Sequence, residues 1–193
     1  MTSQALIDAI AVTAELCGTT LSAPAQRQLA ADLARYPEDQ VFGALAKCRR
    51  ELKYRLTIAE IISRIDDGRP GPDEAWAMLP KGEEETVVWT PEMMAAHSAS
   101  RHAETDQARR AAFREKYLAL VAEAREKCTP PCWHVSIGWD KNGRDAPLTA
   151  AILAGRIELD SVRHEMSPNA VAMLEQRQPD PELPPPVKLK LVR

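Results

Sequence analysis

The feature that most constrains this chain is a series of helix start and stop signals in residues 1–68. Apolar residues recur at helical spacing from Leu6 to Ala14, and Gly18 then provides a stop. Ser22 is a suitable cap for a second helix, because its hydroxyl can accept a hydrogen bond from a free backbone amide in the first turn. No period-2 alternation typical of a strand occurs here, so the pattern predicts helices.

Two more helices complete this segment. Pro37 opens the third helix, and Thr57-Ile-Ala-Glu60 fits a capping box that starts a short fourth helix. Asp66-Asp67-Gly68 ends the fourth helix. The expected buried stripe of the third helix is Val41, Phe42, Leu45, Cys48 and Leu52. We therefore predict a small four-helix N-terminal domain over residues 1–68 that folds without the rest of the chain.

Composition restricts the class of protein. The 193 residues are 45% apolar and 27% charged, but only 5% are aromatic, so helical packing with thin, alanine-rich cores is expected. A net charge of −3 argues against a surface devoted entirely to nucleic acid, although a local basic patch fits. The start of the chain lacks the pattern of a signal peptide, and no apolar run suits a bilayer. We expect no membrane partner, a cytoplasmic location in a bacterial host, and four reduced cysteines.

The remaining chain divides by composition. Residues 69–90 contain a hinge-like Arg-Pro-Gly-Pro and an acidic run, and predict a linker with one short helix. Thr90-Pro91-Glu92 predicts the start of a long helix that reaches about Lys127. Residues 91–177 are expected to form this long helix plus a second small, mainly helical domain. Residues 178–193 are expected to be an extended, proline-rich and basic tail. The predicted fold class is all-α.

The second domain should form around the apolar half of the long helix and a short Trp-rich arm. The arm alternates in the way that a short strand or an extended packing segment does. The residues expected to pack this C-terminal domain are Phe113, Tyr117, Leu120, Val121, Trp133 and Trp139.

Cys128, Cys132 and His134 raise the question of a zinc site. Structural zinc needs four ligands, usually as paired Cys-x2-Cys or Cys-x2-Cys with a His pair. The spacing here is Cys-x3-Cys-x-His, and no second ligand pair lies nearby in the sequence. The competing interpretation is architectural, with two prolines forming a tight exit from the long helix. We favour the architectural interpretation and expect no metal and no other cofactor.

Catalytic signatures are absent from the sequence. It contains no Gly-x-Ser-x-Gly, no phosphate-binding Gly-x-x-x-x-Gly-Lys-Ser/Thr and no Gly-x-Gly-x-x-Gly. We therefore predict a protein that is not an enzyme.

The densest basic cluster is Arg49, Arg50, Lys53 and Arg55, at the end of the third helix. Cations at this position favour the helix dipole and can simply be solvated. Alternatively, four cations within seven residues form a patch for phosphate or for an acidic protein face. The fourth helix is short and its exposed face is not basic, which argues against direct readout of duplex DNA by a helix-turn-helix.

The order of these signals resembles a known family. Leu21-Ser22 opens the second helix, Tyr36-Pro37 precedes the third, and Leu56-Thr57-Ile58-Ala59-Glu60-Ile61 opens the fourth. This arrangement is similar to the N-terminal helical domain of phage replicative-helicase loader/inhibitor proteins, in which a Pro-Thr-Ile-Ala-Asp/Glu-Ile segment follows a helix rich in alanine and charge. The resemblance covers residues 1–68.

The resemblance implies a DNA-replication adaptor without catalysis. Proteins of that family carry a hexameric replicative helicase to a phage origin and hold it inactive. They release it onto single-stranded DNA when an origin-binding phage protein takes over. The partners implied are therefore a hexameric helicase, an origin-binding protein and DNA. Two alternatives remain open at this point: a DNA-binding regulatory protein that uses the cluster at residues 49–55, and a small zinc-stabilised regulatory domain.

Overall fold

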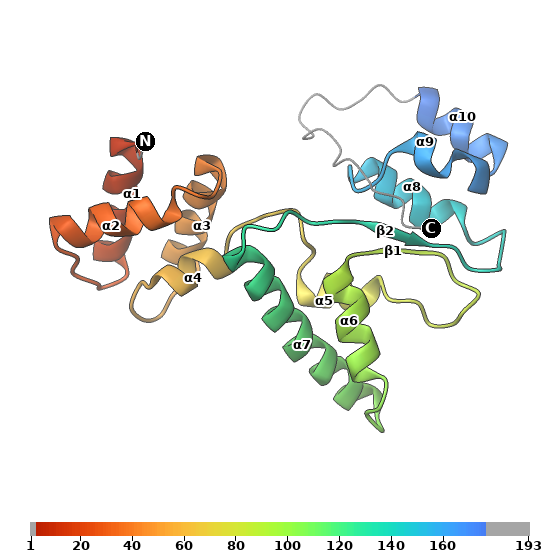
Figure 1. Ribbon diagram of the computed structural model, residues 1–193, viewed down its shortest axis with the longest axis horizontal. Coiled ribbons are helices and arrows are strands. Elements are labelled where there is room, and N and C mark those ends of the chain that lie inside the picture. The colour runs from red at the N-terminus through yellow and green to blue at the C-terminus, as the bar shows by residue number, and fades with distance from the viewer. Residues whose placement is uncertain (1–2, 177–193) are drawn as a thin grey trace. The chain divides into compact units, whose positions relative to one another are not determined.

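The computed structural model describes residues 3–176 and confirms the all-α fold class (Figure 1). Helices make up 61% of these residues, and a single two-stranded sheet is the only sheet among them. None of the described helices combines the length and apolar character needed to cross a membrane. The predicted tail over residues 178–193 lies outside the described residues.

The described chain forms two compact units. The first unit contains the described residues up to Arg69 together with Ala119–Pro130. The second unit contains Pro70–Leu118 and the described residues from Pro131 onward. The boundary between the units falls inside one helix, α7 (Asp106–Glu126), which contributes residues to both.

The first unit holds the four predicted N-terminal helices. Their bounds are α1 Gln4–Leu16, α2 Ala23–Leu33, α3 Glu38–Glu51 and α4 Ile58–Ser63. The predicted caps are present: the hydroxyl of Ser22 accepts from the amide of Ala25 at 3.4 Å, and that of Thr57 accepts from the amide of Glu60 at 3.3 Å. The starts of α2 and α4 therefore follow from local sequence.

Aliphatic side chains from all four helices form the core of the first unit. In the predicted stripe of α3, Val41, Leu45 and Cys48 are buried, while Phe42 and Leu52 are partly buried and pack against the same core. Gly18 follows α1 with a φ of 67°, a left-handed conformation that glycine adopts without the steric cost that a side chain brings. The chain can therefore turn sharply from α1 toward α2.

The end of α7 closes the first unit through a partly buried charge cluster. Asp67 lies 3.2 Å from the guanidinium of Arg125 and 2.5 Å from that of Arg69, whose side chain is only 1% exposed. Arg69 also donates to the carbonyl of Thr129 at 3.1 Å, and the hydroxyl of Tyr36 donates to the carbonyl of Arg125 at 3.0 Å. A segment distant in sequence therefore completes the N-terminal helical unit.

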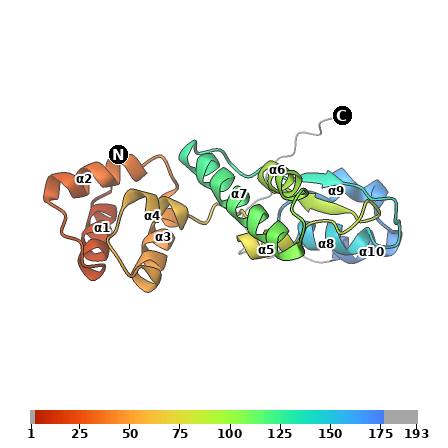
Figure 2. The same cartoon turned by 90° about the horizontal axis from the view of Figure 1, so that it is seen from below.

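The second unit combines short helices with a β ribbon. Its elements are α5 Pro72–Ala77, β1 Val87–Trp89, α6 Pro91–Ser100, the first part of α7, β2 His134–Ser136, α8 Asp145–Leu153, α9 Leu159–Val162, a 3-10 turn at Arg163–Glu165, and α10 Pro168–Gln176. The strands are antiparallel, with Val88 opposite Val135. Helix α8 packs against β1, and α10 packs against α8 (Figure 2).

The predicted continuous helix from residue 91 to 127 is wrong, because the structure contains two helices, α6 and α7, separated by residues 101–105. No glycine or proline marks this break. Hydroxyl groups mark it instead: Ser100 donates to the carbonyl of His97 at 2.8 Å, and Thr105 accepts from the amide of Ala108 at 3.2 Å. Side-chain hydroxyls that bond to the backbone compete with helix propagation, and Thr105 caps a new helix.

Residues 69–90 are more than a linker. The predicted short helix is α5, but the segment also supplies β1, which the sequence analysis did not predict. Within α5, Trp76 contacts Phe113 edge to face with ring centroids 5.3 Å apart. Phe113 stacks on Tyr117 at 5.5 Å, and the buried Tyr117 hydroxyl donates to the carbonyl of Pro70 at 2.8 Å. An aromatic cluster therefore fixes this segment in the second unit.

Candidate interaction surfaces

The basic cluster lies at the end of α3 and in the loop to α4 (Figure 1). Arg49 is tied to the scaffold, because its guanidinium donates to the hydroxyl of the buried Thr13 on α1 at 2.7 Å. Arg50, Lys53 and Arg55 are exposed, and none of them forms an ion pair with another described residue. These three cations thus present uncompensated positive charge to solvent.

A neighbouring carboxylate does not neutralise the cluster. Glu51 is the acidic residue inside it, but its carboxylate accepts from the guanidinium of Arg64 at 3.0 Å. Arg64 also pairs with Glu60, so α4 supplies its own cation for both acids. Burial lowers the pKa of Arg64, but the hydrogen bonds with Glu60 and Glu51 outweigh it and raise the pKa. The charge of Glu51 is therefore already balanced from α4.

Tyr54 stands in the middle of this cluster with its side chain 82% exposed. The loop that contains Tyr54 is anchored by Leu56. The side chain of Leu56 is buried, and its amide donates to the hydroxyl of Thr19 at 2.9 Å. An exposed aromatic ring on an anchored loop does not contribute to the core. We call Arg50, Lys53, Tyr54 and Arg55 the basic surface.

The second unit has its own exposed aromatic residue, Trp139, with a side chain that is 73% exposed. The backbone on both sides of it is fixed: Gly138 donates to the hydroxyl of Thr86 at 3.0 Å, and Asp140 donates to the carbonyl of Glu84 at 3.1 Å. A Cβ on Gly138 would lie only 2.0 Å from the carbonyl oxygen of Glu84, so glycine is required there. We call residues 137–141 the tryptophan loop.

The backbone of the tryptophan loop lies next to the backbone of an acidic segment. The amide of Asp140 donates to the carbonyl of Glu84, and Gly138 approaches the same residue, which belongs to Glu83-Glu84-Glu85, the acidic run of the sequence. The nearby guanidinium of Arg144 is already occupied, since it donates to the carbonyl of Gly138 at 2.9 Å and pairs with Glu165 at 2.6 Å. The second unit therefore presents an exposed tryptophan on an anchored loop that contains one exposed cation, Lys141, whereas the basic surface of the first unit contains three.

The six predicted packing residues separate into different roles. Phe113, Tyr117 and Trp133 are buried in the second unit, and Arg156 lies 4.7 Å from the centre of the Trp133 ring. The expected packing of Trp139 is wrong, because its side chain is exposed.

Two other residues of this set, Leu120 and Val121, belong to the first unit. Val121 is buried there and Leu120 is partly buried. Their predicted role in the C-terminal domain is therefore corrected, since α7 changes units before it reaches them.

The cysteines and His134 do not gather into a metal centre within residues 3–176, where no group of three or more metal-ligating side chains occurs. Cys132 lies 3.6 Å from the ring of His134, but Cys128 belongs to the other unit. Cys128 has a φ of 51° and ends α7, with its amide bonded to the carbonyl of Arg125 at 2.9 Å. Burial raises the pKa of Cys48 to about 11, so this thiol stays protonated near neutral pH.

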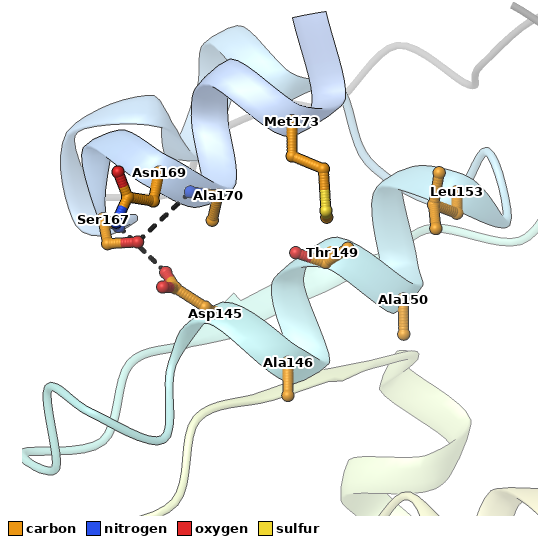
Figure 3. Close-up of a pocket in the computed structure, with 9 residues that line it drawn as sticks. All are labelled: Asp145, Ala146, Thr149, Ala150, Leu153, Ser167, Asn169, Ala170 and Met173. Atoms are coloured by element: carbon orange, nitrogen blue, oxygen red, sulfur yellow. Dashed lines mark hydrogen bonds between the residues drawn. The ribbon is translucent and has the colours of Figure 1, made fainter. Parts of the chain in front are cut away.

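A shallow groove of about 590 Å³ lies between α8 and α10 (Figure 3). Its lining is mainly apolar and includes Leu153, Ala170 and Met173. The polar groups at one end bond to each other, since the amide of Ser167 donates to Asp145 at 2.9 Å.

No protein-family model matches this chain, and comparisons with curated proteins and with solved structures also found no match. The candidate surfaces therefore rest on this chain's own residues.

Two residues with a candidate role were not identified from the sequence. Tyr54 lies inside the predicted basic cluster. The sequence signal for its exposure is its position beyond the end of α3, away from the apolar stripe. Trp139 was assigned to packing because it continues the alternation of the arm. The neighbouring Gly138 and the turn after Asp140 were the signals that the strand ends before it.

Proposed function

We propose that this protein is a non-catalytic adaptor of DNA replication, which binds a hexameric replicative helicase, holds it inactive and loads it on single-stranded DNA. The observation that carries the proposal is the presence of two exposed aromatic residues, Tyr54 and Trp139, one on each compact unit. An adaptor needs separate surfaces for separate partners, and the three cations around Tyr54, which form no ion pair with another described residue, let the two surfaces select different partners.

In this proposal the tryptophan loop is the helicase contact. Tryptophan is enriched among residues that dominate binding energy, and a loop whose backbone is already ordered loses little entropy on binding. The amides of Gly138 and Asp140 hold the backbone on both sides of Trp139 through their hydrogen bonds. The basic surface then serves the second partner, an origin-binding phage protein or DNA.

The resemblance of the N-terminal segment to helicase loader/inhibitor proteins supports the same proposal. The residues that carry the resemblance have defined roles here: Ser22 and Thr57 cap α2 and α4, and Tyr36-Pro37 immediately precedes α3. These are roles in folding, so they bear on the N-terminal architecture and leave the partner to be tested directly.

The direct test mixes the full-length protein with a bacterial hexameric replicative helicase and measures co-elution and ATPase rate. We expect a stable complex with a reduced ATPase rate. Trp139→Ala should weaken the complex at least tenfold, because buried interface tryptophans commonly cost about 2 kcal/mol or more on truncation. Tyr54→Ala, the matched removal of an exposed aromatic from the other unit, should leave helicase affinity unchanged. Absence of any complex would overturn the adaptor proposal.

A second candidate function is a DNA-binding regulatory protein. The uncompensated cations Arg50, Lys53 and Arg55 favour it. This candidate predicts DNA binding without helicase binding, whereas the adaptor proposal requires the helicase complex, so the same co-elution experiment separates them.

A further inference from the structure

The basic surface combines charge and aromatic character in one short segment. Arg50 lies in the last turn of α3, and Lys53, Tyr54 and Arg55 follow within the loop to α4. All four side chains are exposed, and the three cations form no ion pair within residues 3–176. A solvated helix end explains cations near a helix C-terminus, but it does not explain an aromatic ring left in water among them.

Burying the ring of Tyr54 would be favourable, because an aromatic side chain covers a large apolar area. The fold nevertheless leaves it 82% exposed, and fixes the adjacent backbone through the buried Leu56 and its bond to Thr19 at 2.9 Å. Glu51, the carboxylate inside the cluster, is paired with Arg64 and therefore does not neutralise the three cations. A flat exposed ring within a field of free cations is the arrangement that binds a charged chain carrying stackable groups.

We propose that the basic surface is a binding site for single-stranded nucleic acid. One base stacks on the ring of Tyr54, while Arg50, Lys53 and Arg55 contact the flanking phosphates. This proposal goes beyond the adaptor function, because a helicase adaptor can act without touching the strand itself. Arg49 is a positioning residue: its bond to Thr13 at 2.7 Å fixes the end of α3 against α1.

Single strands fit this surface better than duplexes. Stacking on a protein ring requires an unpaired base, which a duplex does not offer without disruption. The helix that follows, α4, has only six residues. Its one charged residue, Glu60, pairs with Arg64, which caps the end of the helix. The surface therefore lacks a basic recognition helix suited to the major groove.

The test measures binding of a fluorescein-labelled oligothymidine to the full-length protein alone by fluorescence anisotropy, over a range of salt concentrations. Three phosphate contacts predict a slope of log affinity against log salt of about −2, from about 0.7 per contact for single strands. Arg50→Gln/Lys53→Gln/Arg55→Gln should abolish most of this slope. Because no helicase is present, failure here leaves the adaptor proposal unaffected.

The matched control is Arg27→Gln/Arg101→Gln/Lys116→Gln. These three residues are also exposed and form no ion pair within the described residues, so the control changes the net charge by the same amount elsewhere. It should retain the slope. An equal loss in both triple variants would mean that only overall charge matters, and would overturn the site.

Tyr54 separates stacking from simple charge attraction. Tyr54→Ala should weaken binding about tenfold with an unchanged salt slope, because base–aromatic stacking does not release counterions. Tyr54→Phe should bind like the wild type, because the ring is retained. No binding at low salt, equal affinity for a duplex, or displacement of the oligothymidine by polyglutamate at equal charge concentration would each overturn the proposal, the last in favour of an acidic protein partner.

Discussion

The contacts that stabilise the first compact unit internally differ from those that stabilise the second. The core of the first unit is mainly aliphatic, and each of its four helices starts at a local signal. The second unit depends on contacts between distant segments, such as Trp76 with Phe113 and β1 with β2. The first unit needs a distant segment only for closure, where Arg125 reaches Asp67. Local signals therefore start the helices of the first unit, whereas contacts between distant segments build the second.

The distribution of tryptophan allows this comparison to be measured. The chain contains four tryptophans, and all of them, Trp76, Trp89, Trp133 and Trp139, belong to the second unit. Tryptophan fluorescence therefore reports unfolding of the second unit, whereas far-UV circular dichroism reports helices of both. Variants that affect one unit should shift the two signals differently during denaturation.

The largest effect is expected for Phe113→Ala. Phe113 is fully buried between Trp76 and Tyr117, so its removal creates a cavity at the centre of the aromatic cluster. The free energy of unfolding of the second unit should fall by about 4 kcal/mol. The fluorescence midpoint in urea should shift strongly, and part of the dichroism transition should stay in place.

Leu118→Ala on the same helix is the control for Phe113→Ala, because Leu118 is about half exposed and its truncation should cost much less. If Phe113→Ala shifts both signals by the same amount, the two units unfold as one, and the comparison between them fails.

Asp67→Asn should have the next largest effect, in the first unit. It removes the carboxylate that compensates Arg69 and Arg125, both of which have side chains at most 15% exposed. Removing one partner from a buried charge cluster costs about 3 kcal/mol. The dichroism transition should shift without a matching shift in fluorescence. Asp66→Asn is the control, since the neighbouring Asp66 is exposed and only 3.6 Å from Lys47 in a surface pair.

The same carboxylate predicts a pH dependence confined to the first unit. Burial alone would raise the pKa of Asp67, but the hydrogen bonds and charges of Arg125 and Arg69 outweigh it and lower the pKa. A lowered pKa means that the stabilisation is complete above the unfolded-state value of about 3.9, and is lost as the pH falls through the folded-state value. Stability of the first unit should fall at acid pH, and Asp67→Asn should remove that part of the dependence.

The difference between local and long-range contacts also explains which helices and strands the sequence could predict. Ser22, Pro37 and Thr57 act within one turn of their own positions, so the starts of α2, α3 and α4 were predictable. The break at Ser100 and Thr105 was missed, because the same residues also fit a continuous alanine-rich helix. Strand β1 was missed because three residues carry no clear period, and its partner β2 lies far along the chain.

The same difference between local signals and long-range contacts applies to the candidate surfaces. The basic cluster was predictable, since four cations within seven residues are visible in the sequence. The exposure of Tyr54 and Trp139 depends on where distant segments, including Thr19 and Glu84, hold their loops. Sequence patterns give the residue types of such a site, whereas tertiary contacts decide which of them face solvent.

A moderate effect is expected for Gly138→Ala. The added Cβ would meet the backbone of Glu84 at 2.0 Å, so the tryptophan loop must move away from its neighbour. We expect a loss of about 2 kcal/mol from the second unit, together with a changed emission of Trp139. Gly43→Ala in α3 is the opposite control: nothing lies within 4 Å of its Cβ position, and helix propensity should stabilise the first unit by about 0.7 kcal/mol.

The smallest effect, and the one with the most informative sign, is expected for Cys128→Gly. Cys128 has a φ of 51° at the end of α7, where its amide and that of Thr129 bond to the carbonyls of Arg125 and Ala124, each at 2.9 Å. A side chain in this left-handed conformation costs about 1 kcal/mol, which glycine avoids. Cys128→Gly should therefore raise the stability of the first unit by up to about 1 kcal/mol, and Cys128→Val should lower it. A structural zinc ion on Cys128 predicts the reverse for glycine: lost stability together with lost metal. Denaturation followed by circular dichroism, with metal analysis of both variants, decides between a helix-ending residue and a metal ligand.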